Sequence, residues 1–235
     1  MVVKNTINIG YWNVNKPISK QCNKLNNNLF LKSIGKCDIS GLSETKCDLS
    51  GIELDTYIVS HFTKEQHPKQ KQVYDGLAIL INKNVRKGVK FLENICSEYQ
   101  WLILDKTFFF GFEDNMFLCF AYINSSFLKD KDFDILANLS DEISTYQDKS
   151  QVMIKGDFNA RTFNLEDCIS NNDDDYNDYV PVPEEYESDK IKQSRVSNDN
   201  KSCSRGKELL DMCISSRSRI LDGRTFGDYQ GTFTS

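Results

Sequence analysis

The sequence predicts a single α/β domain with mixed β-sheets, spanning residues 1–235. Short runs rich in β-branched and aromatic residues recur along the chain, and segments with apolar residues at helical spacing lie between some of them. The chain is 39% hydrophobic and contains 15 Phe and 10 Tyr, enough to bury one large core or two small ones. It contains no internal repeats.

Strands are predicted where such residues run together between polar or turn-forming residues. The predicted strands cover residues 6–14, 38–44, 56–62, 76–82, 87–93, 101–110, 116–124 and 151–158, with short ones at 219–223 and 231–235. Helices are predicted where apolar residues recur three or four positions apart. These helices cover residues 25–36, 130–147 and 204–216.

Residues 164–203 are predicted to form a long, partly disordered loop within the domain. The segment is polar and carries Pro181 and Pro183, and ten Asp or Glu residues lie between positions 166 and 189. Part of it has the spacing of an EF-hand calcium loop, but Asp178 stands where the sharp turn requires Gly. Calcium binding by this loop is therefore rejected.

The charge distribution limits the partners that the protein can have. The net charge of −5 argues against a general electrostatic nucleic-acid binder, because such binding needs clustered Lys and Arg. Residues 61–90 nevertheless hold seven Lys or Arg against two acidic residues. Such stretches are commonly solvated surface. The alternative is a local nucleic-acid contact, for which the candidates are Lys64, Lys69, Lys71 and Arg161.

Cysteine and histidine usage gives no support to a zinc site. None of the eight cysteines forms a C-x-x-C pair, and the sequence has only two histidines, His61 and His67. We expect reduced thiols in an intracellular protein of the cytoplasm or nucleus. No apolar run approaches the roughly 20 residues that span a bilayer, and no signal peptide is recognisable, so no membrane partner is expected.

Polar side chains stand at the ends of four predicted strands. They are Asn13, Asn15, Glu44, Tyr122, Asp157 and Asn159, the last two within the run "VMIKGDFNART". A turn explains the glycine of that run but not an acid and an amide two residues apart. Strand ends are where α/β sheets place their sites, so these side chains are expected to converge if the strands lie side by side.

Such a cluster suits the hydrolysis of a phosphate ester. Mg²⁺ takes oxygen ligands, usually one or two carboxylates, and Glu44 with the Asn13 amide oxygen meets that demand. Asp157 can orient and deprotonate the attacking water. Asn159 and Tyr122 can donate hydrogen bonds to a phosphate oxygen. Each residue also has an ordinary structural alternative, and the spacing alone does not choose between them.

The runs "YWNVN", "SETK", "GLAILI", "FAYIN" and especially "GDFNAR" resemble the endonuclease/exonuclease/phosphatase superfamily, which has the DNase-I-like fold. The whole arrangement, from Thr6 to Ser235, is most similar to the endonuclease domain of non-LTR (LINE-type) retrotransposons. This resemblance implies a four-layer sandwich of two mixed β-sheets packed face to face with helices outside. It also implies DNA as the substrate and Mg²⁺ or Mn²⁺ as the cofactor.

The resemblance further implies a role for each matching position. Asn13 and Glu44 match the Asn and Glu of the metal site. Tyr122 matches the Tyr that lies against the scissile phosphate. Asp157 and Asn159 match the "GDFN" motif, in which the Asp serves with the nucleophilic water.

The chain also departs from the family pattern. Asn15 falls where some relatives carry an acidic residue near the metal, and "INSS" follows Tyr122 where relatives usually have "IPP" or "APN". The family closes with an Asp-bearing strand and an "SDH" motif whose His contacts the phosphate, whereas this sequence ends at "GTFTS". We therefore expect a C-terminally truncated domain with weak or no activity, in which neither His61 nor His67 replaces the missing His.

The function predicted from sequence is thus that of a retroelement endonuclease domain, whose complete form nicks DNA with Mg²⁺ or Mn²⁺. Two alternatives stay open. One is a phosphatase or deadenylase of the same fold, because a fold alone does not choose the substrate. The other is a non-catalytic remnant that binds nucleic acid through residues 64–90.

Overall fold

The structure is a computed structural model, and the chain divides into two compact units. The first unit comprises Met1–Lys131 and Thr145–Phe158, and the second comprises Asp132–Ser144 and Asn159–Ser235. The residues that the structure describes are 6–19, 23–62, 76–93, 96–123, 134–168, 195–225 and 228.

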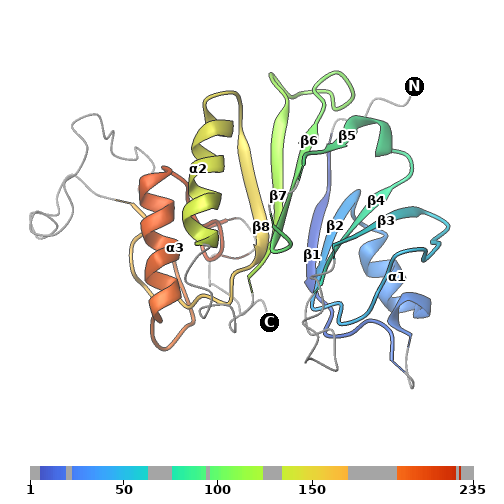
Figure 1. Ribbon diagram of the computed structural model, residues 1–235, viewed down its shortest axis with the longest axis horizontal. Helices are drawn as coiled ribbons and strands as arrows, with labels where there is room; N and C mark the ends of the chain where they lie inside the picture. The colour runs from blue at the N-terminus through green and yellow to red at the C-terminus, as the bar shows by residue number, and fades with distance from the viewer. Residues whose placement is uncertain are drawn as a thin grey trace, which may run out of the picture. The chain divides into compact units, whose positions relative to one another are not determined.

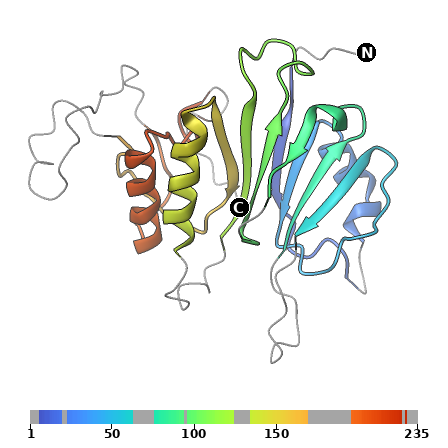
Figure 2. The same cartoon turned by 45° about the horizontal axis from the view of Figure 1, so that its top comes forward.

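The first unit contains two mixed four-stranded sheets, shown in Figures 1 and 2. The first sheet has the order β1-β2-β4-β3, formed by β1 (Ile9–Asn13), β2 (Ile39–Ser43), β4 (Leu77–Asn82) and β3 (Tyr57–Phe62). The second has the order β5-β6-β7-β8, formed by β5 (Val89–Phe91), β6 (Tyr99–Leu104), β7 (Met116–Tyr122) and β8 (Val152–Asp157). The parallel pair is β1–β2 in the first sheet and β7–β8 in the second, and the other neighbouring strands are antiparallel. Both sheets are therefore mixed, as predicted.

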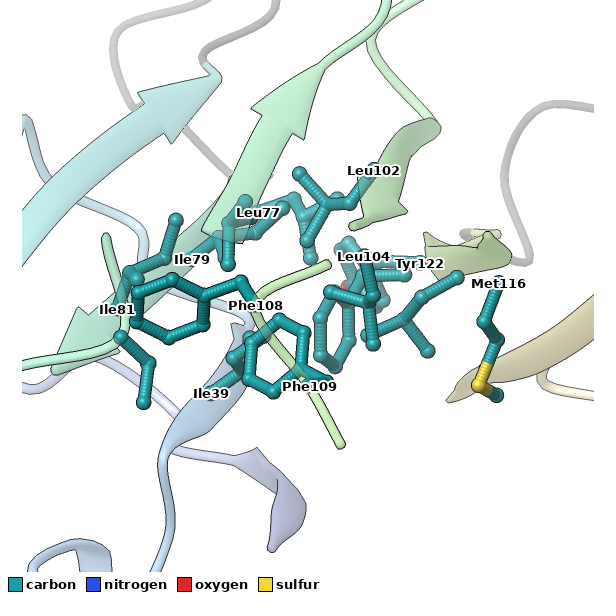
Figure 3. Packing of buried hydrophobic residues seen from close by; sticks show 14 residues of the cluster. Ile39, Leu77, Ile79, Ile81, Leu102, Leu104, Phe108, Phe109, Met116 and Tyr122 are labelled. Atoms are coloured by element: carbon teal, nitrogen blue, oxygen red, sulfur yellow. The ribbon is translucent and has the colours of Figure 1, made fainter. Parts of the chain in front are cut away.

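The two sheets pack face to face around an apolar core (Figure 3). Successive side chains of a strand point to opposite faces, so alternate residues of β7, such as Leu118 and Phe120, face the first sheet. They meet Ile79 and Ile81 of β4 in one buried cluster. On β2, Gly41 permits this approach, because a methyl group there would overlap the ring of Phe120.

Helical residues lie on both outer faces of this sandwich. On the first sheet lies α1 (Asn28–Ile34), which Figure 1 shows beside its strands. Asn27 caps this helix, and Ile34 is buried in one cluster with Leu80 of β4. Short 3₁₀ turns at Lys24–Asn26 and Arg86–Gly88 lead into α1 and β5. On the second sheet, Tyr146 from the last turn of α2 stacks on Phe117 at 4.4 Å between ring centroids and lies edge-on to Trp101 at 4.9 Å.

The second unit contains α3 (Ser204–Ser215) and residues 135–144 of α2 (Ile135–Gln147). In α2, Leu139 and Ile143 are fully buried, as their helical spacing predicts. The carboxylate of Asp167 is also buried, and it accepts two hydrogen bonds from Arg224 at 2.9 and 3.1 Å and one from Ile220 N at 2.7 Å. This paired acid holds residues 219–224 in place.

Two sequence predictions of local structure are wrong. β6 ends at Leu104, because Phe108 N and Phe109 N both donate to Asp105 O and turn the chain there. Residues 219–223 form no strand and bond to Asp167 instead. His61 lies on β3, within the strand predicted over residues 56–62, and its side chain is 1% exposed.

Other predictions fall partly outside the described residues. Positions 231–235 and residues 169–194 of the predicted acidic loop are in this group. The described ends of that loop are bonded, since Arg195 Nη2 donates to Phe163 O at 2.6 Å and Val196 N donates to Gly223 O at 3.0 Å. The seven cysteines within the described residues are free thiols. No helix in the described part of the chain has the length and apolar character to cross a membrane.

Candidate active site

The last residues of β1 and β8 meet across the sandwich. Asn13 ends β1 and Asp157 ends β8, and Asn13 Nδ2 donates a hydrogen bond to Asp157 Oδ2 at 3.2 Å. The same nitrogen donates to Glu44 Oε1 at 2.8 Å. Glu44 directly follows β2, whose last residue, Ser43, is the register partner of Asn13. One amide nitrogen therefore holds two carboxylates that come from different sheets.

The facing edges of the two sheets explain this meeting. Along β8, Lys155 and Asp157 point toward the first sheet, because residues two apart in a strand share a face. Lys155 Nζ donates to Ile9 O of β1 at 3.2 Å, and Tyr11 OH of β1 donates to Ala121 O of β7 at 2.8 Å. β1 is thus bonded to both β7 and β8, and the polar ends of β1 and β8 coincide.

Lys46 lies beside Glu44 and was not among the residues predicted for the site. Its Nζ is 2.5 Å from Glu44 Oε2 and donates to Asn15 Oδ1 at 2.8 Å. Burial raises the pKa of Glu44, but the hydrogen bonds from Lys46 and Asn13 and the positive charge of Lys46 outweigh it and lower that pKa. Glu44 is therefore held in its ionised form.

The amide of Asn13 is oriented differently from the sequence prediction. Its oxygen was predicted to face a metal ion together with Glu44. In the structure, Asn13 Oδ1 accepts a hydrogen bond from Asn15 N at 3.2 Å, and the nitrogen faces the carboxylates. Asn13 therefore acts here as a donor that positions two acids.

Tyr122 is in register with Asp157 at the end of the parallel pair β7–β8. The residue is 6% exposed and belongs to the buried cluster between the sheets that Figure 3 shows. Beyond it, Ile123 N donates to Asp157 O at 2.9 Å and extends the pairing by one residue.

Asn159 and Arg161 belong to the second unit, and both are exposed. Asn159 has a φ of 48°, so the chain turns there. Arg161 exchanges two hydrogen bonds with Cys203, the residue before α3: Arg161 N donates to Cys203 Sγ at 3.2 Å, and Cys203 N donates to Arg161 O at 2.9 Å. The other predicted nucleic-acid contacts, Lys64, Lys69 and Lys71, lie outside the described residues.

The donor set around Glu44 fits a divalent cation. Glu44 and Asn15 present oxygen atoms from two turns, and the ammonium group of Lys46 already lies between them. A site that holds one cation between a carboxylate and an amide oxygen has the chemistry that Mg²⁺ or Mn²⁺ prefers.

A second group of possible ligands fits a cation less well. Among the described residues, Glu166, Asp167 and Cys168 in the second unit also offer ligand atoms close to one another. However, Asp167 is fully buried and both of its carboxylate oxygens accept hydrogen bonds from Arg224, so this acid has no exposed oxygen to offer a cation.

Comparisons with known proteins return only distant structural likenesses. No protein-family model matches the chain, and no curated protein matches it. A 3′ phosphatase, NExo, from Neisseria bound to product DNA hairpin is 16% identical, with a TM-score of 0.41 over 67% of this chain and 59% of that one.

Two further solved structures resemble this chain at similarly low sequence identity and TM-score. An AP endonuclease, LMAP, from Leishmania major is 14% identical, with a TM-score of 0.44 over 65% of this chain and 55% of its own. An endonuclease/exonuclease/phosphatase family protein from Leptotrichia buccalis is 12% identical, with a TM-score of 0.42 over 66% of this chain and 67% of its own. TM-scores and identities this low carry no argument about function. The strand order of this chain defines its fold, and the hydrogen bonds of Asn13 define the candidate site.

Proposed function

We propose that this chain is a DNase-I-like phosphodiesterase domain that hydrolyses a phosphodiester of DNA. The observation that carries the proposal is the Asn13 amide nitrogen shared by Glu44 Oε1 and Asp157 Oδ2. It places an acid suited to hold a cation beside an acid suited to accept a proton, at the ends of strands from two sheets. The resemblance of "YWNVN", "SETK" and "GDFNAR" to that superfamily supports the same assignment.

Asp157 is proposed as the general base. It takes a proton from the attacking water as the water oxygen forms a bond to phosphorus and the bond from phosphorus to the 3′ oxygen breaks. Solvent returns a proton to that oxygen, so the products are a 3′-hydroxyl and a 5′-phosphate. Asn13 Nδ2 donates to Oδ2 of Asp157, which fixes the orientation of that carboxylate.

Glu44 is proposed as the main ligand of a divalent cation, with Asn15 Oδ1 as a neighbouring amide ligand. Asn13 is proposed to join them once its amide group is turned so that the oxygen, and not the nitrogen, faces the cation. Mg²⁺ or Mn²⁺ bound there would supply positive charge against the negative charge that develops on the phosphate. Tyr122 and Asn159 are proposed to donate hydrogen bonds to a phosphate oxygen. Arg161, with Lys64, Lys69 and Lys71, is proposed to contact the DNA backbone.

The test compares the wild-type chain with Asp157→Asn and Glu44→Gln in the nicking of supercoiled plasmid with Mg²⁺ or Mn²⁺. Loss of a general base costs about 10²–10⁴-fold in rate, and we expect Asp157→Asn to fall in that range. Circular dichroism shows whether each variant is folded. Cutting by a folded Asp157→Asn variant at the wild-type rate would overturn the assignment.

The finer proposal is that the domain belongs to a retroelement and leaves a 3′-hydroxyl that primes reverse transcription. It is supported by the resemblance to non-LTR endonuclease domains. Assays on plasmid DNA, poly(A) and inositol phosphates separate it from a phosphatase or deadenylase of the same fold. Extension of the nicked strand by a polymerase demonstrates the 3′-hydroxyl directly. Salt-dependent DNA binding without cutting would instead indicate a non-catalytic remnant.

A further inference from the structure

The turn that carries Glu44 adopts a backbone conformation that side chains other than glycine seldom adopt. Glu44 has a φ of 53° and Lys46 a φ of 48°, one on each side of Thr45. Residues in this left-handed region persist only where the surrounding structure holds them. The direction in which the Glu44 carboxylate points therefore depends on what holds this turn.

Thr45 anchors the turn in the interior of the first unit. It is fully buried, and its backbone N donates to Gly76 O at 3.3 Å. Its hydroxyl Oγ1 lies 2.9 Å from His61 Nε2. The fit is tight, because a methyl group added at Gly76 would overlap Thr45 Oγ1.

The second ring nitrogen of His61 holds the far side of the same turn. Leu49 N donates to His61 Nδ1 at 3.1 Å. Because a backbone N–H can only donate, Nδ1 accepts, and the proton of the neutral ring is on Nε2 and is donated to Thr45 Oγ1. Burial lowers the pKa of His61, against the opposing effect of Asp48, whose Oδ1 is 3.3 Å from Nδ1. The neutral ring thus matches Thr45 and Leu49, whereas the Asp48 carboxylate favours a proton on Nδ1.

We propose that His61 is a positioning residue for the candidate metal site. Its two ring nitrogens hold Thr45 and Leu49, and the turn at residues 45–49 in turn directs the carboxylate of Glu44 toward Asn13. His61 makes no hydrogen bond or ion pair with Glu44, so the effect of His61 on the Glu44 carboxylate passes through the turn. The proposal rests on the proposed function, in which Glu44 is a metal ligand.

The first test is the affinity for Mn²⁺, measured by titration calorimetry on the full chain. Thr45→Val removes the hydroxyl that His61 bonds, and His61→Asn removes the donor while keeping an acceptor for Leu49 N. Loss of an outer-shell partner typically weakens metal binding by about 10–100-fold, and we expect each variant to fall in this range. Thr45→Ser keeps the hydroxyl and is expected to bind Mn²⁺ like the wild type.

A matched control separates positioning from general stability. Tyr57 lies on the same strand as His61, and its hydroxyl donates to Ile34 O at 2.7 Å and Cys37 O at 2.8 Å, away from the turn. Tyr57→Phe removes these bonds and is expected to lower the midpoint of unfolding with no change in Mn²⁺ affinity. Equal loss of affinity in Tyr57→Phe and His61→Asn would overturn the positioning role.

A double variant tests whether His61 acts through Thr45. Thr45→Val and His61→Asn delete the same hydrogen bond from opposite ends, so their combination is expected to bind Mn²⁺ no more weakly than the weaker single variant. Independent losses that multiply in the double variant would contradict the proposal.

Nitrogen-15 spectra of the metal-free protein distinguish a failure of this inference from a failure of the proposed function. We expect the Nε2–H tautomer of His61 at neutral pH and slow hydrogen exchange at Leu49 N. A proton on Nδ1 would overturn the inference whether or not metal binds. The expected tautomer in a wild-type chain that binds no Mn²⁺ would overturn the metal site and leave the His61-held turn supported.

Discussion

At the scale of single residues, the candidate site is a balance of charges around one neutral amide. Asn13 keeps the carboxylates of Glu44 and Asp157 close to each other by donating to both. Lys46 offsets the charge of Glu44, as the lowered pKa of that acid shows. One donor holds the two acids close together, which suits a site where one acid binds a cation and the other accepts a proton.

Replacing the central amide by a third acid tests this balance. In Asn13→Asp the donor is lost and like charges face one another, so we expect the free energy of unfolding in EDTA to fall by about 1–3 kcal/mol. Mn²⁺ is expected to restore the loss, because a divalent cation favours the clustered carboxylates. The measurement is urea unfolding with and without Mn²⁺, with Asn13→Ala as the control that adds no charge. A variant as stable as the wild type in EDTA would contradict the shared-donor geometry.

The buried neutral His61 gives the protein a stability that depends on pH. Its pKa is lowered from 6.5 by burial, so the unfolded chain takes up a proton at a higher pH than the folded chain does. At a pH above the ordinary His pKa, His61 is neutral in both the folded and the unfolded chain, and its contribution to stability is complete. This contribution is lost as the pH falls below the ordinary pKa toward the lowered pKa of the folded chain. We expect urea midpoints of the wild type to drop between about pH 7.5 and pH 5.5, a window around the ordinary His pKa. His61→Asn is expected to show a smaller drop, and an identical drop would mean that His61 is not buried in its neutral form.

At the scale of elements, strands that carry long apolar runs could be predicted from sequence, because burial on a sheet demands such runs. The aromatic run after Leu104 misled the prediction, since the turn at Asp105 overrides the strand preference of Phe108 and Phe109. Asn13, Glu44 and Asp157 were identifiable as polar residues following buried strands. Their shared hydrogen bonds were not, because pairing between sheets leaves no periodic signal. His61 was missed because a polar residue in a short strand looks solvent-facing.

The close approach of the sheets at β2 gives a test of their packing. A methyl group at Gly41 would overlap the rings of Phe120 and Tyr11, and overpacking of this kind costs about 1–3 kcal/mol in the free energy of unfolding. Gly41→Ala is therefore expected to unfold at lower urea concentration. Adding Phe120→Leu makes room for the methyl group, so the double variant should be more stable than the sum of the single effects predicts. Simple additivity would show that Gly41 does not face Phe120.

At the scale of the whole molecule, the site depends on contacts between residues far apart in the chain. Each sheet has its parallel pair at one edge, and the edge strands β1 and β8 face each other across the sandwich. The acids of the site therefore meet only after both sheets have formed and docked. Loop-closure entropy makes such long-range pairing slow, so the site is expected to assemble late in folding. The net charge of −5 further means that the proposed DNA substrate would have to contact a local basic surface rather than the molecule as a whole.

Binding of Mn²⁺ to the metal-free chain, followed by electron paramagnetic resonance and by the midpoint of thermal unfolding, tests the central claim most directly. Binding to the folded chain alone stabilises it by about 2.7 kcal/mol when free Mn²⁺ reaches 100 times its Kd. We predict this stabilisation in the wild type, its loss in Glu44→Gln and its weakening in Asp157→Asn. Mn²⁺ bound equally well by the wild type and by a folded Glu44→Gln variant would place the cation elsewhere and contradict the proposed site.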